Sequence, residues 1–252
     1  MLALTLVGIG AGDPGLLSPR AIGALRDADL ILIPLKGPEK ADLADIRRKI
    51  LADAAGDGRV VEFDLPHRAD DACAYLDGVN DWHDAVAGAW REAIVRHLPG
   101  GGRVALMIWG DPSLYDSSLR IAGRLRAGGM DLSVTVVPGI TSLQLLAAAH
   151  AIPLNRLGAP FLVTTGRRLA ADGWPAGVDS VAVMLDGACA FQGLPPDDLT
   201  IWWGAYLGMP QQILRAGALA ETGAEIVARR AAARARHGWI MDVYLLRRTS
   251  PR

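Results

Sequence analysis

Residues 2–14 read LALTLVGIGAGDP, an apolar run that ends in a glycine-rich loop. A short apolar run without polar alternation is typical of a strand that is buried on both faces of a sheet. The loop, Gly8–Pro14, precedes a segment in which Ile22 and Leu25 have helical spacing. The stretch therefore predicts the first strand, turn and helix of a parallel α/β domain. Because the run lacks a basic start and leads directly into glycines, it favours a strand over a signal peptide.

Strand-like and helix-like segments alternate along the rest of the chain. The first half predicts strands at 29–34, 59–64, 103–109 and 131–137, with helices at 19–28, 41–54 and 70–97. A segment rich in Pro, Gly and Asn follows at 152–160, and beyond it we expect strands at 161–165, 180–185, 200–203 and 239–247 and helices at 211–222 and 224–236. The pattern predicts an α/β protein with two α/β domains, a parallel-sheet domain at 1–152 and a mixed-sheet domain at 153–252.

Composition and charge exclude several classes of protein. The formal net charge of the 252 residues is −1, so we expect no binding to nucleic acid or to an anionic membrane surface. No apolar run approaches the roughly 18 residues that span a bilayer. The two cysteines, Cys73 and Cys189, are far apart in the chain, which favours a reducing cytoplasm over a disulfide-bonded setting. No group of His, Cys and carboxylate residues has metal-ligand spacing, and we expect no metal.

The glycine loop invites a dinucleotide-binding interpretation, because it lies between a strand and a helix. Two features oppose a Rossmann-type oxidoreductase. The third glycine comes one residue too early for G-x-G-x-x-G, and the second strand ends in Ile33-Pro34-Leu35-Lys36, without the acid that binds a ribose. No Gly-Lys-Ser/Thr follows the loop, so it is not a phosphate-binding Walker loop either.

Two further strand ends carry loops of the same composition. Gly110-Asp-Pro-Ser-Leu-Tyr115 follows the strand at 103–109, and Pro138-Gly-Ile-Thr-Ser142 follows the strand at 131–137. Turn formation alone accounts for any one of these loops. Ligands of open parallel sheets bind beyond the carboxyl ends of the strands, where glycines let the backbone approach them. Three such loops together favour a small-molecule cleft, with Asp111 and Thr141 as polar contacts.

The three loops resemble the motifs of the tetrapyrrole (corrin/porphyrin) methylase family. The matching stretches are GIGAGDPGLLS at 8–18, WGDPSLYDS at 109–117 and VPGITSLQLLAAAHAIPLN at 137–155, in that order. The resemblance extends over essentially the whole chain. Longer stretches, among them MIWGDPSLYDSSLRI and HGWIMDVYLLRR, are similar to those family members of the aerobic cobalamin pathway that act on precorrin-5. Sirohaem-type methylases carry G-G-D-P where this chain has Trp109-Gly-Asp-Pro112.

The resemblance implies a class III methyltransferase-like fold, with S-adenosylmethionine in the cleft between two α/β domains. It implies methylation of precorrin-5 at ring carbon C-1 and loss of the acyl group as acetate, in a homodimer. The expected cofactor-binding residues are Trp109, Gly110, Asp111, Leu114, Thr141, Ser142, Leu185, Gly204, Ala205, Ile240 and Met241.

Loss of the acyl group needs addition of water to a carbonyl, which a general base or an oxyanion donor assists. The candidates for these catalytic roles are His67, Asp13 and Tyr115. Arginines bind carboxylates by paired hydrogen bonds, so we expect the acidic side chains of the substrate to be bound by Arg68, Arg167 and Arg168. The aromatic residues Trp202, Trp203 and Tyr206 either stack on the edge of the macrocycle or simply pack, and stacking is favoured because they follow a strand into a glycine loop. Arg47, Arg48 and Lys49 are expected to form a solvated helix face.

Two alternatives within the resemblance stay open. The first alternative to methylation of precorrin-5 at C-1 is a related methylase that acts at another ring carbon, and the second is a non-catalytic protein that binds corrinoid intermediates. Motifs of a cofactor site do not separate the first alternative from the main interpretation, while the intact G-D-P loop with Asp111 speaks against the second.

Overall fold

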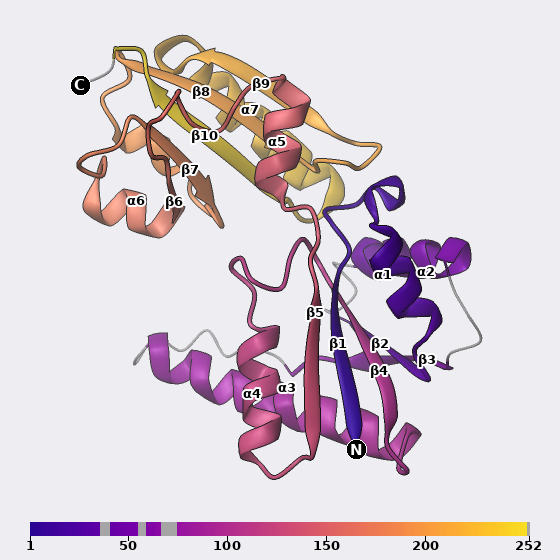
Figure 1. Ribbon diagram of the computed structural model, residues 1–252. Coiled ribbons are helices and arrows are strands. Elements are labelled where there is room, and N and C mark those ends of the chain that lie inside the picture. Colours follow the sequence, from indigo (N-terminus) through magenta and orange to yellow (C-terminus); the bar gives the residue numbers. More distant parts are fainter. Residues whose placement is uncertain (36–40, 55–58, 67–74, 251–252) are drawn as a thin grey trace. The chain divides into compact units, whose positions relative to one another are not determined.

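The computed structural model describes residues 1–35, 41–54, 59–66 and 75–250. The chain forms two compact units, Met1–Ile140 and Thr141–Arg252 (Figure 1). The division lies upstream of the Pro- and Gly-rich segment at 152–160, because helix α5 (Ser142–His150) contacts strands of the second unit.

The first unit is built on a parallel five-stranded sheet in the order β3-β2-β4-β1-β5. Its strands are β1 (Leu2–Gly8), β2 (Leu30–Leu35), β3 (Arg59–Asp64), β4 (Gly102–Ile108) and β5 (Leu132–Val137). Helices α1 (Pro19–Arg26) and α2 (Ala41–Ala54) cover one face, and α3 (Tyr75–His97) and α4 (Ser118–Ala127) cover the other (Figure 1). Leu6 packs towards α3 and α4 while Val7 packs towards α1 and α2, which confirms the expectation of strands buried on both faces.

The second unit is built on a mixed five-stranded sheet in the order β6-β7-β10-β8-β9. Its strands are β6 (Leu162–Thr165), β7 (Ser180–Met184), β8 (Leu199–Ala205), β9 (Ile213–Ala218) and β10 (Asp242–Arg248). Strand β10 runs antiparallel to both β7 and β8, so β7 and β8 point the same way. Helices α5, α6 (Gly166–Asp172) and α7 (Leu219–His237) complete the unit.

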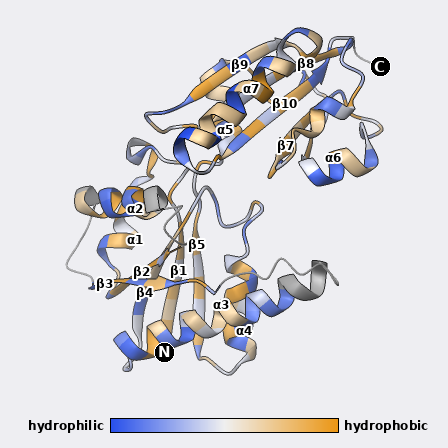
Figure 2. Ribbon diagram, turned by 180° about the vertical axis from the view of Figure 1, so that it is seen from behind, coloured by the Kyte–Doolittle hydropathy of each residue, from blue (hydrophilic) through white to orange (hydrophobic). Residues whose placement is uncertain are grey.

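The helices of both units mix hydrophilic and hydrophobic residues, whereas the central strands carry the continuous hydrophobic stretches (Figure 2). In the first unit, apolar residues of α1 to α4 pack with the strands in two core clusters. Within the described ranges, no helix has the length and apolar character needed to cross a membrane.

The predicted helix at 211–222 is wrong. Residues 213–218 instead form β9, which pairs with β8 from Ile213 opposite Ala205 to Ala218 opposite Thr200. Gly217 has φ of 155°, which an α-helix does not allow. The free edge of β8 supplies backbone partners that the local sequence does not reveal, and one helix, α7, then occupies Leu219–His237.

Candidate active site

The three glycine loops of the first unit meet at the carboxyl ends of β1, β4 and β5. Gly10 and Gly110 exchange backbone hydrogen bonds of 3.2 and 2.8 Å. A Cβ atom at Gly139 would lie 2.2 Å from the carbonyl oxygen of Gly110, and one at Gly8 would lie 2.5 Å from the nitrogen of Gly139. The loops therefore pack backbone against backbone, and the glycines are required by this close approach.

Asp111 ties two of these loops together. One carboxylate oxygen accepts a hydrogen bond of 2.8 Å from the nitrogen of Ser113 and another from its hydroxyl, and the second oxygen accepts 2.8 Å from the nitrogen of Gly139. Burial raises the pKa of this carboxyl, but the three hydrogen bonds outweigh burial and bring the pKa below its usual value. The buried carboxylate thus shapes the backbone of the G-D-P loop.

Three further expected site residues flank Asp111 in the sequence, and a fourth, Asp13, lies in the first glycine loop. Tyr115 has φ of 49° and is 45% exposed as a residue, and partial burial of its phenol raises its pKa. Trp109 and Leu114 are half-buried, and Trp109 packs on the core beneath α1 and α2. Asp13 accepts a hydrogen bond of 2.8 Å from the nitrogen of Gly15 and caps the short 3-10 helix Pro14–Leu16.

Arg47 contacts the carboxyl end of β4, just ahead of the G-D-P loop, and the expectation that it belongs to a solvated helix face is wrong. Its side chain is buried beneath the carboxyl end of β4, where Nε donates to the carbonyl of Met107 at 3.3 Å. Burial lowers its pKa to about 10, against an opposing effect of the Asp116 charge. On α3, His83 is also buried, and its Nε2 lies 2.8 Å from the hydroxyl of Ser117. Sequence reasoning missed Arg47 because its neighbour Arg48 does lie on the surface, paired with Glu62.

In the second unit, the register of the sheet brings most of the expected cofactor residues to one edge. Met184 at the end of β7 pairs with Thr165 at the end of β6, and Ala205 at the end of β8 pairs with Asp242 at the start of β10. Leu185, Gly204, Ala205 and Met241 therefore lie at the same end of the strands. The nitrogen of Tyr206 donates to the carbonyl of Met241 at 2.9 Å, which joins the loops after β8 and before β10.

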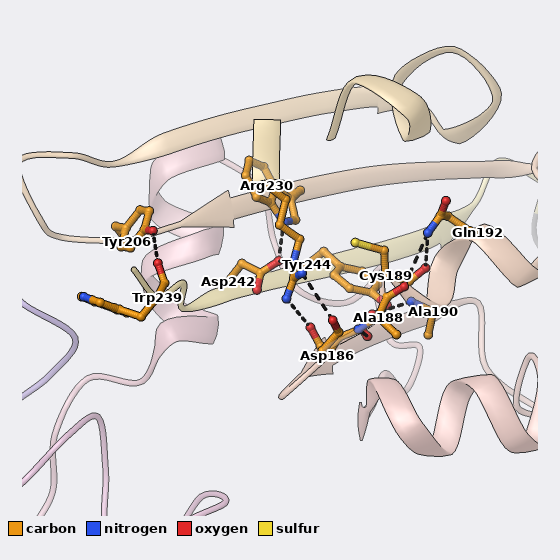
Figure 3. Close-up of polar contacts among 12 residues, drawn as sticks. Asp186, Ala188, Cys189, Ala190, Gln192, Tyr206, Arg230, Trp239, Asp242 and Tyr244 are labelled. Carbon is orange, nitrogen blue, oxygen red and sulfur yellow. Dashed lines mark hydrogen bonds and ion pairs between the residues drawn. The ribbon is translucent and has the colours of Figure 1, made fainter. Parts of the chain in front are cut away.

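Two residues at this edge have left-handed backbone conformations that non-glycine residues rarely adopt. Leu185 has φ of 53° and is 66% exposed, and Tyr206 has φ of 50°. Such strained positions cluster at ligand sites, where the surrounding structure must hold them. The hydroxyl of Tyr206 donates to the carbonyl of Trp239, which fixes the loop that leads to Ile240 and Met241 (Figure 3).

The expected stacking of Trp203 and Tyr206 on the macrocycle is wrong, because both side chains are buried inside the second unit. The indole nitrogen of Trp203 donates to Asp242 at 2.9 Å. Their apolar bulk fills the interior between the sheet and α7, and the sequence context of a strand entering a glycine loop does not distinguish this packing from exposure. Trp202 is half-buried, with the guanidinium of Arg247 over its ring at 5.1 Å.

The remaining predicted site residues lie at loop and helix starts. Thr141 forms a capping box with Gln144 at the start of α5, and Ser142 is the first residue of that helix. Arg167 and Arg168 are exposed in the first turn of α6, and Arg168 pairs with Asp172 at 3.0 Å. His67 and Arg68 lie outside the described residues.

Two loop systems built from backbone contacts, each at the carboxyl ends of strands in its own α/β unit, are the arrangement expected of a tetrapyrrole methylase. The model of the Tetrapyrrole (Corrin/Porphyrin) Methylases matches residues 3–223, and the chain belongs to this family.

Comparison with individual proteins shows which members of the family the chain is similar to. The chain is 45% identical over 251 residues to "Precorrin-6A synthase [deacetylating]" from Sinorhizobium sp, covering 98% of this chain and 96% of the relative. A precorrin-2 C(20)-methyltransferase from Sinorhizobium sp is 30% identical, but over only 59% of this chain and 58% of its own. Among solved structures, a cobalamin synthesis related protein (CobF) from Corynebacterium diphtheriae superimposes with a TM-score of 0.85 at 37% identity, covering 99% and 100% of the two chains.

Proposed function

We propose that this chain is a precorrin-6A synthase of the deacetylating type. It transfers a methyl group from S-adenosylmethionine to ring carbon C-1 of precorrin-5 and releases the acyl group as acetate, giving precorrin-6A. The observation that carries the proposal is the 45% identity to the precorrin-6A synthase of Sinorhizobium sp over 98% of the chain, a range that includes both loop systems. Similarity to the methyltransferase that acts at C(20) extends over only 59% of the chain, which disfavours methylation at that carbon.

The residues of both edges suit S-adenosylmethionine, which supplies a methyl group on a positively charged sulfur. Gly110 offers only backbone groups, and Leu185 offers an exposed apolar side chain to an adenosyl group, whereas Gly204 and Ala205 are buried at the end of β8. We assign the binding of this cofactor to Trp109, Gly110, Asp111, Leu114, Thr141, Ser142, Leu185, Gly204, Ala205, Ile240 and Met241.

Methyl transfer asks little acid–base chemistry of the protein, because the attacking ring carbon is already electron-rich. The chain contributes by holding the reactants in line, which is the main source of rate in such a step. The rigid backbone contact between Gly8, Gly110 and Gly139 supplies a fixed platform for that alignment.

Release of acetate needs a group that stabilises the oxyanion formed when water adds to the acyl carbonyl. Burial raises the pKa of Tyr115, so its phenol keeps its proton at neutral pH and is able to donate it in a hydrogen bond. We assign this role to Tyr115, with Asp13 as a further candidate on the same edge. The exposed Arg167 and Arg168 are assigned to the carboxylates of the substrate.

Replacement of Tyr115 by phenylalanine tests the assignment. Loss of one oxyanion donor is expected to slow acetate release about 100-fold while leaving the affinity for S-adenosylhomocysteine unchanged. Single-turnover assays that follow acetate and S-adenosylhomocysteine separately measure both steps. Unchanged acetate release in Tyr115→Phe would remove Tyr115 from the mechanism.

The function itself is tested by incubating the protein with S-adenosylmethionine and precorrin-5 and measuring S-adenosylhomocysteine and acetate together. Equal amounts of both products are expected. Methylation without acetate would assign the chain to a methylase for another ring carbon. Tight corrinoid binding with neither product would make it a carrier of pathway intermediates.

We also propose that the protein acts as a homodimer in the cytoplasm. The family resemblance supports the dimer, and the two widely spaced cysteines of the sequence suit a reducing compartment. Light scattering of the purified protein measures the oligomeric state directly, and a monomeric mass would contradict this part of the proposal.

A further inference from the structure

A buried polar network in the second unit joins α7, β10 and the turn after β7 (Figure 3). Nε of Arg230, on α7, donates to Asp242 at 2.9 Å, and the two side chains are only 11% and 7% exposed. Trp203 donates to the same carboxylate oxygen. Through Nη2, Arg230 also donates to the backbone carbonyl of Asp186 at 2.8 Å. A single guanidinium thus connects the start of β10 with the turn after β7.

The side chain of Asp186 is the second anchor of this network (Figure 3). One oxygen accepts 2.7 Å hydrogen bonds from the hydroxyl of Tyr244 and the nitrogen of Ala190, and the other accepts 2.9 Å from the nitrogen of Ala188. A Cβ atom at Gly166 would lie 2.3 Å from Cγ of Asp186, so the start of α6 is shaped to admit this carboxylate. The network therefore restrains the backbone of 186–190 through both its carbonyl and its amide groups.

Leu185 directly precedes this anchored turn. It is held in the left-handed region with φ of 53°, yet the residue is 66% exposed, so packing into the core does not explain why a leucine occupies this position. Strain of this kind persists only where the surrounding structure enforces it. Leu185 shares the strand-end edge with Ala205 and Met241.

We propose that Arg230, Asp242, Asp186 and Tyr244 are positioning residues that hold Leu185 in the conformation that binds the adenosyl part of the methyl donor. The inference rests on the proposed function. None of the four is assigned a contact with the cofactor; they act through the backbone of the turn. When such a turn is free to leave the binding conformation, the apparent association constant equals the intrinsic one multiplied by the fraction of molecules that still hold that conformation.

The test compares S-adenosylhomocysteine binding by calorimetry in the wild-type chain and in Tyr244→Phe. The substitution removes one hydroxyl from Asp186 and preserves the ring, and we expect the dissociation constant to rise about tenfold, as for loss of one hydrogen bond to a charged group. At saturating cofactor, kcat is expected to change little. The matched control is Glu225→Gln, because Glu225 pairs with Arg215 at 2.7 Å and ties α7 to β9 without touching the turn. We expect wild-type affinity in this control.

A double-mutant cycle with Leu185→Gly separates positioning from general support. Glycine has no preference against the left-handed region and no side chain to present, so Tyr244→Phe is expected to have little further effect on affinity in that background. Additive losses, or equal losses in Tyr244→Phe and Glu225→Gln, would show that the network merely supports the unit and would overturn the inference. Wild-type affinity in Tyr244→Phe would overturn it as well and leave the proposed function intact. Absence of binding in the wild-type chain would instead reject the proposed function, and the inference with it.

Discussion

Substitution of Asp111 by asparagine tests how far one carboxylate holds the G-D-P loop. Asparagine keeps an oxygen for the nitrogen of Ser113 but turns its amide group towards the nitrogen of Gly139, which now donates to Asp111 at 2.8 Å. The change removes one charge-assisted hydrogen bond and leaves an amide donor facing another donor, a cost of about 2–4 kcal/mol. For a chain of this size we expect a fall in melting temperature of roughly 5–15 °C.

Loss of the bond between Asp111 and Gly139 is also expected to shift the loop at Gly139 and so to weaken S-adenosylhomocysteine binding. The reason is that Gly139 packs on the backbone of Gly110 and Gly8. Differential scanning calorimetry measures the stability, and isothermal titration measures the affinity. Asp29→Asn is the control: Asp29 also accepts from a backbone nitrogen, that of Arg103 at 2.8 Å, but at the opposite end of the sheet. Its affinity is expected to stay at the wild-type value. A melting temperature and affinity of Asp111→Asn within error of the wild type would refute the reasoning.

Two further predictions concern the same edge. The pKa of Asp111 is lower in the folded protein than its unfolded value of about 3.9, so its contribution to stability is present above that pH and is lost as the pH falls through the folded pKa. Thermal unfolding between pH 7 and pH 3 should therefore show a smaller acid-induced fall in melting temperature in Asp111→Asn than in the wild type. Parallel curves of melting temperature against pH would contradict this. Gly139→Ala should destabilise the first unit by about 1–3 kcal/mol or prevent folding, because the new Cβ meets a backbone oxygen at 2.2 Å that has little freedom to move. In urea unfolding, Gly123→Ala on α4 is its control and should be neutral or stabilising, since its Cβ meets nothing within 4 Å.

Local patterns predicted the strands of the first unit, because most of them are apolar runs and the loops after them carry their own turn residues, but these patterns missed helix α4. The expected segments at 41–54 and 59–64 coincide with α2 and β3. The predictions that failed depend on partners distant in sequence. Strand β9 exists because β8 offers it an edge, and Arg47 is buried because it reaches a carbonyl at the end of β4. The residues next to β9 and next to Arg47 in the sequence do not indicate either partner.

By itself the sequence determined the α/β class, the family and the positions of the glycine loops. These features follow from apolar periodicity, from residues that permit close backbone approach and from motifs contiguous along the chain. Only the tertiary structure decided which polar groups hold the loops. The hydrogen bond between Asp111 and Gly139 joins residues 28 positions apart in the sequence, and the one between Tyr244 and Asp186 joins residues 58 positions apart. Hydrogen bonds over such separations exist only once the strands have paired, because the sheet register brings their donors and acceptors within 3 Å of each other.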